Sequence, residues 1–169
     1  LHCAVKLVEG EIWVRGPNVM RGYWNDAAAT AAALDGDGWF HTGDLARIDA
    51  DGYYWILGRS RELIISGGEN IYPAELENVL ADCPQIAESA VIGIADAKWG
   101  EAACAIVVPA QGAHLDEAGV LALFQDRLAR FKHPRRVVFA DGLPKNALGK
   151  VQKHELKKLE AEHPDLVTP

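Results

Sequence analysis

Two polar residues in the first part of the chain have side chains suited to a nucleotide-like ligand. Asp44 lies in the block His-Thr-Gly-Asp-Leu, residues 41–45, and Arg59 follows Gly58. A carboxylate beside glycine can accept two hydrogen bonds from a ribose diol. An arginine carries a permanent charge and a planar set of donors, which fits phosphate or ribose oxygens. Alone, Thr-Gly-Asp is far more typical of a plain turn, and the arginine is equally typical of an exposed loop, so the pair matters more than either member.

Two glycine-containing motifs in the second part of the chain are also candidates for a functional role. Gly67 and Gly68 follow the apolar run 63–65, and such a pair lets the backbone bend sharply and lets a ligand approach closely. The competing interpretation is a plain strand-to-helix turn, because Pro73 suits the first turn of a helix. Lys150 follows Gly149 at the end of the block Leu143–Lys150, with Lys145 as a weaker candidate cation. The histidines, including His41, have no metal-ligand spacing, and we predict no metal site.

Length and composition predict an ordinary globular protein. The 169 residues are enough for one domain, or one domain plus a piece of another. The formal net charge of −7 gives no reason to expect nucleic-acid binding. Residues 127–158 nevertheless hold ten Lys/Arg against two acidic residues. This basic block suggests a small anionic ligand, and a solvated basic face is the alternative.

The cysteines and the hydropathy of the chain indicate its cellular compartment. The three cysteines are widely spaced and form no metal-ligand pattern, which favours a reducing, cytoplasmic compartment without disulfides. No signal peptide is visible, and the longest small or apolar run, residues 102–110, is too short to span a bilayer. The chain begins at Leu1 and enters a strand pattern almost at once, so we expect a fragment of a longer protein.

Hydrophobic periodicity predicts a strand-rich first portion and a mixed second portion, with the boundary at 59–62. The first portion has strand patterns at 11–15, 39–48 and 53–57, and an Ala-rich helix at 27–34 that Asn25 or Asp26 can cap. The second portion is predicted to contain strands at 63–66, 88–95, 102–108 and 136–140, and helices at 73–81, from Asp116 to about 131, and 151–162.

Three blocks in this order, residues 41–45, 58–77 and 143–150, resemble the C-terminal part of the adenylate-forming enzymes, specifically the acyl-CoA ligases. The resemblance covers about residues 10–160. It implies an α+β fold: residues 1–60 would end the large, strand-rich N-terminal domain, and residues 61–169 would be the complete small C-terminal domain, a short, mainly antiparallel sheet flanked by helices. The family's phosphate-binding loop and acyl pocket lie upstream of such a segment.

The resemblance also implies roles for individual residues. Asp44 would hold the ribose of ATP and of the acyl-adenylate, and Arg59 would contact the nucleotide. Arg61 falls at the hinge position, which is usually Asp or Lys. Gly67 and Gly68 would line the pantetheine channel, and Lys150 would stabilise charge near the α-phosphate during adenylation. The block 131–136 would supply cations near the CoA nucleotide.

The predicted function is therefore the C-terminal part of an ATP-dependent acyl-CoA ligase. It would activate a carboxylic acid, fatty acids included, as an acyl-adenylate and transfer it to CoA, with Mg²⁺ shielding the phosphates. Three alternatives stay open. The first is a unit that loads a carrier protein, and the second is a nucleotide- or CoA-binding module without activity. The third concerns which carboxylic acid is activated. The oligomeric state is not predicted, and we expect no ligase activity from this chain alone.

Overall fold

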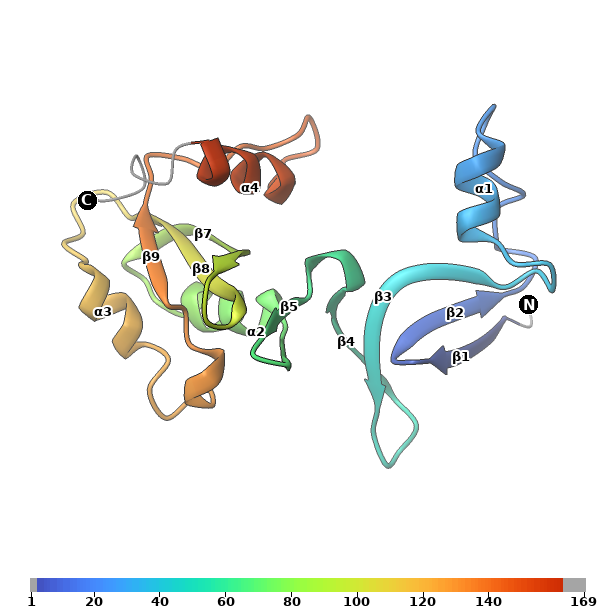
Figure 1. Ribbon diagram of the computed structural model, residues 1–169, viewed down its shortest axis with the longest axis horizontal. Helices are drawn as coiled ribbons and strands as arrows, with labels where there is room; N and C mark the ends of the chain where they lie inside the picture. The colour runs from blue at the N-terminus through green and yellow to red at the C-terminus, as the bar shows by residue number, and fades with distance from the viewer. Residues whose placement is uncertain (1–2, 163–169) are drawn as a thin grey trace. The chain divides into compact units, whose positions relative to one another are not determined.

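Four antiparallel strands in the order β1-β2-β3-β4 make up most of the first part of the chain. The structure is a computed structural model that describes residues 3–162 (Figure 1). The strands are β1 (Ala4–Val8), β2 (Glu11–Arg15), β3 (Phe40–Ile48) and β4 (Tyr54–Arg59). Between β2 and β3 lies α1 (Ala27–Ala33), whose N-terminus is capped by Asp26, the second of the two predicted caps.

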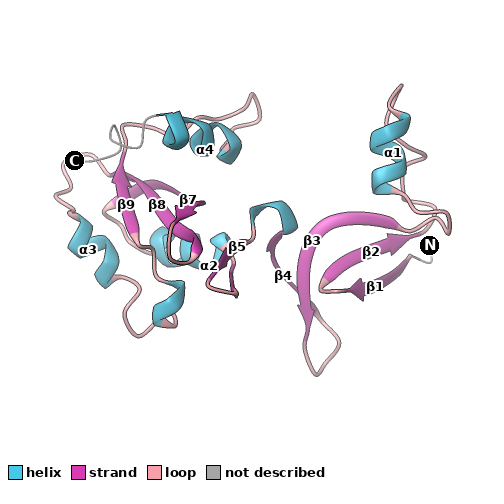
Figure 2. Ribbon diagram, in the orientation of Figure 1, coloured by secondary structure: helices cyan, strands magenta, loops and turns pink. Residues whose placement is uncertain are grey.

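The second part of the chain forms a five-stranded sheet with helices on both faces (Figure 2). Its strands are β5 (Ile64–Ser66), β6 (Glu69–Ile71), β7 (Ile86–Asp96), β8 (Gly100–Pro109) and β9 (Arg136–Phe139). The path runs β6-β5-β8-β7, all antiparallel, while β9 adds to β8 in parallel. The predicted α+β class, with a mainly antiparallel sheet flanked by helices, is confirmed.

The central strand β8 explains why both faces of this sheet are covered. Ala103, Ala105 and Val107 point into one apolar cluster, and the alternate residues Cys104 and Ile106 into the other. The first cluster receives α2 (Pro73–Ala81), α3 (Glu117–Ala122) and Phe124, and the second receives α4 (Lys153–Glu162). A strand buried on both faces needs a continuous apolar run, which residues 102–108 supply.

The chain divides into two compact units, Leu1–Arg61 and Glu62–Pro169. A single turn of 3₁₀ helix, Ser60–Glu62, crosses the division. Another 3₁₀ turn, Arg130–Lys132, precedes β9. Within residues 3–162 no helix combines the length and the apolar character needed to cross a bilayer.

The structure differs from the prediction at two helices and at one strand. The helix predicted to run from Asp116 to about 131 stops at Ala122, and Asp126 adopts φ 60°, which a right-handed helix cannot contain. The helix predicted at 151–162 begins at Lys153, because Val151 instead forms a bridge with Lys145. The strand β6 was not predicted at all.

Candidate functional site

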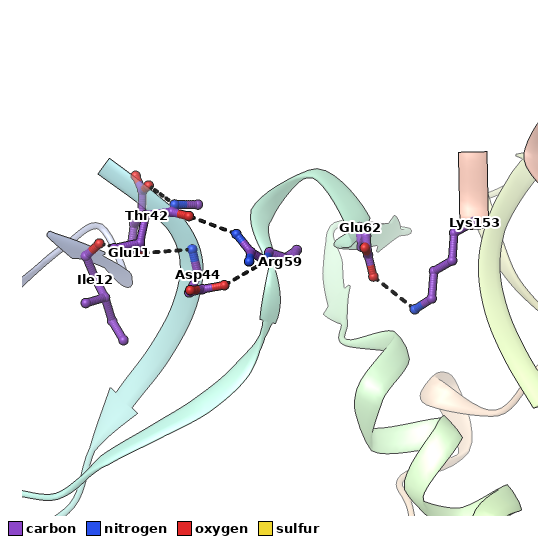
Figure 3. Close-up of polar contacts among 8 residues, drawn as sticks. Glu11, Ile12, Thr42, Asp44, Arg59, Glu62 and Lys153 are labelled. Carbon is purple, nitrogen blue, oxygen red and sulfur yellow. Dashed lines mark hydrogen bonds and ion pairs between the residues drawn. The ribbon is translucent and has the colours of Figure 1, made fainter. Parts of the chain in front are cut away.

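Asp44 and Arg59 face each other across paired strands. They are register partners of β3 and β4, and the Arg59 Nε lies 2.9 Å from Asp44 Oδ1 (Figure 3). The guanidinium also donates to the carbonyl oxygen of Thr42 at 3.0 Å. Asp44 therefore sits within β3, inside the strand predicted at 39–48. The antiparallel register brings together the two residues that we predicted for nucleotide binding.

The backbone before Asp44 is held by contacts that the sequence analysis missed (Figure 3). Glu11 accepts a 2.7 Å hydrogen bond from the N–H of Gly43 through one oxygen and a 3.1 Å bond from the Trp13 indole through the other. The Thr42 hydroxyl donates to the carbonyl oxygen of Ile12 at 2.7 Å and accepts from the Asp44 N–H at 3.0 Å. The only sequence signal for Glu11 is its spacing of two from Trp13, which places both side chains on one face of a strand.

An open hollow of about 600 Å³ lies beside this pair within the first unit. Thr42, Gly43 and Arg59 line it together with Tyr23 and Ala29. Gly43 has φ 71°, a conformation that favours glycine and that turns the chain toward Asp44. A carboxylate, a guanidinium and exposed backbone beside one hollow can bind a diol or a phosphate.

His41, to which we assigned no role, stacks on Trp13 with ring centroids 3.8 Å apart. Its Nε2 is buried and has no hydrogen-bond partner among residues 3–162, and a carboxylate oxygen of Asp35 is 3.8 Å away.

Gly67 and Gly68 form the turn of a β-hairpin between β5 and β6. They have φ 60° and 87°, and Ser66 pairs with Glu69 across them. Positive φ at both central residues is typical of the tight hairpin turns that glycine pairs favour. The alternative of a plain strand-to-helix turn is therefore wrong, because β6 lies between the glycines and α2.

Trp99 packs directly against Gly67. A Cβ placed on Gly67 would lie 2.5 Å from Trp99 Cε3, whereas a Cβ on Gly68 would meet nothing within 4 Å. The N–H of Gly67 donates to the carbonyl oxygen of Trp99 at 2.8 Å. The two glycines therefore differ: Gly67 is needed for close packing, and Gly68 borders open space.

The ring of Trp99 also carries two cations. Lys98 Nζ lies 4.6 Å from the ring centroid and Arg135 Cζ lies 4.9 Å from it. Asp96 fixes the turn by accepting from the N–H groups of Trp99 and Lys98, and these bonds hold the pKa of Asp96 below its usual value. Trp99 therefore belongs structurally to the glycine hairpin.

Lys150 lies on an exposed loop of the second unit. The loop is closed by the bridge between Lys145 and Val151, and Asn146 accepts from the N–H groups of Leu148 and Lys150 at 3.0 Å. Gly149 adopts φ 77°. Among residues 3–162 no carboxylate lies within ion-pair distance of the Lys150 ammonium. Its charge is therefore not neutralised by a neighbouring acidic residue of this part of the chain.

Half of the ten cations in the basic block are paired inside the second unit. Five of its cations contact acidic residues of other elements: Lys132 with Glu75, Arg136 with Glu160, Lys145 with Glu88, Lys153 with Glu62 and Glu77, and Arg127 with Asp82. Folding therefore offsets part of the charge segregation seen in the sequence. Arg61, the predicted hinge residue, is exposed on the 3₁₀ turn at the division between the units.

Comparison with known proteins supplies the family. Residues 75–150 match the AMP-binding enzyme C-terminal domain. The chain is 53% identical over 171 residues to indoleacetate–CoA ligase of Aromatoleum aromaticum, covering 95% of this chain and 33% of the relative. The chain thus spans about a third of the length of the curated relatives that it matches.

Two solved structures are similar in fold. ATP-bound MatB from Rhodopseudomonas palustris aligns with TM-score 0.81 and 45% identity over 94% of this chain and 31% of its own. The o-succinylbenzoate CoA synthetase from Bacillus subtilis, in complex with its acyl-adenylate intermediate, aligns with TM-score 0.85 and 39% identity over 92% of this chain and 34% of its own. Residues 75–150 therefore belong to the AMP-binding enzyme C-terminal domain family, and the chain as a whole is similar in sequence and fold to about a third of the length of known CoA ligases.

Proposed function

We propose that this chain supplies the C-terminal part of an AMP-forming acyl-CoA ligase, called the parent ligase below. The observation that carries the proposal is the pairing of Asp44 with Arg59 beside a hollow in one unit, while Lys150 and the glycine hairpin belong to the other. The parent ligase would convert a carboxylic acid and ATP into acyl-adenylate and pyrophosphate. It would then transfer the acyl group to the thiol of CoA and release AMP.

In the first half-reaction, Asp44 would accept hydrogen bonds from the ribose hydroxyls, and Arg59 would contact the nucleotide. Because the two side chains already hold each other at 2.9 Å, little side-chain entropy would be lost when the nucleotide binds. Lys150 would stabilise the negative charge that grows on the phosphoryl oxygens as the acid attacks. Its unpaired ammonium supports this role.

In the second half-reaction, the hairpin turn at Gly67 and Gly68 would border the channel for the pantetheine arm. The open space beside Gly68 supports this assignment. Arg61 would be the hinge about which residues 61–169 reorient relative to residues 1–60, so that Lys150 and the hairpin serve different half-reactions. The division of the chain after Arg61 supports that location.

Two further components belong to the same proposal. Mg²⁺ would accompany the phosphates of ATP, and we assign it no ligand from this chain, because residues 3–162 contain no cluster of three or more candidate metal-ligating side chains. The acid would be a small carboxylic acid from the reducing cytoplasm. Fatty and aromatic acids are the first classes to test, since one relative is named for indoleacetate.

The test uses Lys150→Ala in the parent ligase and follows the two half-reactions separately. We expect acid-dependent pyrophosphate exchange to fall about 10²–10³-fold, because one electrostatic stabiliser of the transition state is lost. Thioester formation from supplied acyl-adenylate should persist. Equal loss in both half-reactions would contradict the role of Lys150. The 169-residue chain alone should show no acid-dependent exchange, and turnover above background would contradict the incomplete-enzyme interpretation.

A further inference from the structure

Lys153 joins the base of the Lys150 loop to two other elements of the second unit. Its Nζ lies 2.9 Å from Glu62 Oε2 and 2.8 Å from Glu77 Oε1 (Figure 3 shows the contact with Glu62). All three side chains are at least 70% buried, with exposed fractions of 19%, 28% and 24%. Two short ion pairs on one shielded ammonium are less weakened by solvent than surface pairs are.

The two carboxylates connect Lys153 to two separate elements of the second unit. Glu77 lies on α2, and its Oε1 also accepts a 2.8 Å hydrogen bond from the N–H of Val91 in β7, which fixes it to the core of the sheet. Glu62 ends the 3₁₀ turn and is the first residue of the second unit, next to Arg61. Lys153 is the first residue of α4, and its ammonium therefore connects this helix to the core of the sheet and to the proposed hinge.

The Lys150 loop is held at both of its stems. On the entering side, Lys145 pairs with Glu88 of β7 at 2.6 Å and bridges Val151. On the leaving side, the N–H of Gln152 donates to the carbonyl oxygen of Pro144 at 2.8 Å, and Lys153 follows directly. Since Lys150 lies only three residues before Lys153, about 4.5 Å of helical rise or 10 Å of extended chain, a shift of Lys153 displaces Lys150.

We propose that Lys153 is a positioning residue for the adenylation half-reaction. By holding Glu62 and Glu77 together, it makes the hinge end of the second unit and the Lys150 loop turn as one body. The inference rests on the proposed function of Lys150. Without the ammonium, Glu62 and Glu77 would face each other as two carboxylates that both lie within 3 Å of one vacated position, and their repulsion would release the hinge end.

The test is Lys153→Met in the full-length parent ligase, because methionine keeps an unbranched apolar stem and removes the charge. We expect kcat for adenylation to fall about 10- to 100-fold, the cost of a small misplacement of a catalytic group, with KM for ATP little changed. Thioester formation from supplied acyl-adenylate should stay near the wild-type rate. Lys153→Arg, which keeps both ion pairs within reach, should retain most of the adenylation rate.

The matched control is Lys158→Met on the same helix, since Lys158 is exposed and makes no ion pair within the described residues. It should leave both half-reactions unchanged. Glu62→Gln is the second variant, because it breaks only the link to the hinge and keeps the pair between Lys153 and Glu77. In a double-mutant cycle, the effects of Lys153→Met and Glu62→Gln on the adenylation rate should be clearly non-additive.

The outcomes separate this inference from the proposed function. If Lys150→Ala impairs adenylation while Lys153→Met and Glu62→Gln do not, the positioning role is wrong and the role of Lys150 stands. Equal losses in both half-reactions, or strictly additive effects, would show that Lys153 serves general stability only. If Lys150→Ala leaves adenylation intact, the proposed function itself fails. If Lys153→Met does not fold, Glu62→Gln and the Arg variant decide the matter.

Discussion

The chemistry proposed for the first unit depends on single residues that hold other residues in place. The ion pair between Asp44 and Arg59 is half-exposed, and such pairs contribute little to stability. Its value is orientation, since it holds Arg59, which lines the hollow, next to Asp44. Glu11 and Thr42 fix the backbone that carries Asp44.

Glu11→Gln tests this support in the parent ligase. The amide can accept from Gly43 or from Trp13 but not from both, so one of the two hydrogen bonds is lost. A hydrogen bond to a charged group contributes about 1.5–3 kcal/mol, but only part of this loss reaches the nucleotide, because Glu11 acts through the backbone before Asp44. We therefore expect KM for ATP to rise about 3- to 10-fold, with a smaller change in kcat. Exposed Glu9→Gln is the control. An unchanged KM for ATP would remove Glu11 from the nucleotide site.

The cysteines give a second prediction at this scale, which needs only the chain itself. Cys3 is exposed, whereas Cys83 and Cys104 are buried, and burial raises the pKa of Cys104 to about 12. Only thiolates react, so Ellman's reagent at pH 8 should label about one thiol quickly and the rest on denaturation. Cys3→Ser should abolish the fast phase. Fast labelling of Cys104, identified by peptide mapping, would contradict its burial.

At the scale of elements, the hairpin of β5 and β6 and the turn at Trp99 form one structure. Glu101 accepts from the N–H of Ile65 at 3.0 Å, which adds to the hydrogen bond between Gly67 and Trp99. Both the turn and the packing of Trp99 require glycine at position 67, whereas only the turn requires glycine at position 68. The two positions can therefore separate a folding role from a channel role.

Gly67→Ala and Gly68→Ala should differ in stability. Both pay about 1–2 kcal/mol for a side chain at positive φ, but only Gly67→Ala also displaces the Trp99 ring. We expect Gly67→Ala to unfold at a lower urea midpoint than Gly68→Ala and to show altered tryptophan emission. In the parent ligase, Gly68→Trp should spare pyrophosphate exchange and reduce acyl-CoA formation. Wild-type acyl-CoA formation with unchanged CoA affinity would take Gly68 off the channel.

At the scale of the whole molecule, the relevant feature is the division of the chain after Arg61. Nucleotide candidates lie before it and Lys150 with the glycine hairpin lies after it. A ligase that uses both sets in turn needs a backbone pivot near this point. The 3₁₀ turn Ser60–Glu62 is short, and its first two residues, Ser60 and Arg61, are exposed, so a change of their dihedral angles disrupts little packing.

Arg61→Pro in the parent ligase tests the pivot, because proline fixes φ near −65° and removes an N–H. We expect one half-reaction to be lost selectively, with adenylation surviving better than thioester formation if the trapped orientation is the adenylating one. Arg61→Ala is the control, since it removes the side chain and leaves the backbone free. Normal rates for both half-reactions in the proline variant would place the hinge elsewhere.

The sequence by itself determined the local elements and the family. Pro73 and the apolar spacing of Leu76, Val79 and Leu80 predicted α2 with its observed bounds, and the apolar run 102–108 predicted the buried strand β8. These signals act over a few residues, which is why they can be extracted from one chain. The helix after Asp116 was overestimated for the same reason, since apolar residues continue beyond Ala122 although the backbone turns at Asp126.

The tertiary structure alone decided which distant residues meet. The register of β3 and β4 placed Arg59 on Asp44, the pairing of β2 with β3 brought Glu11 to Gly43, and folding of the second unit set Trp99 on Gly67 and Lys153 between two carboxylates. Charge and composition could not show this, because an ion pair depends on position in space and a one-residue change of register would turn each strand residue to the other face.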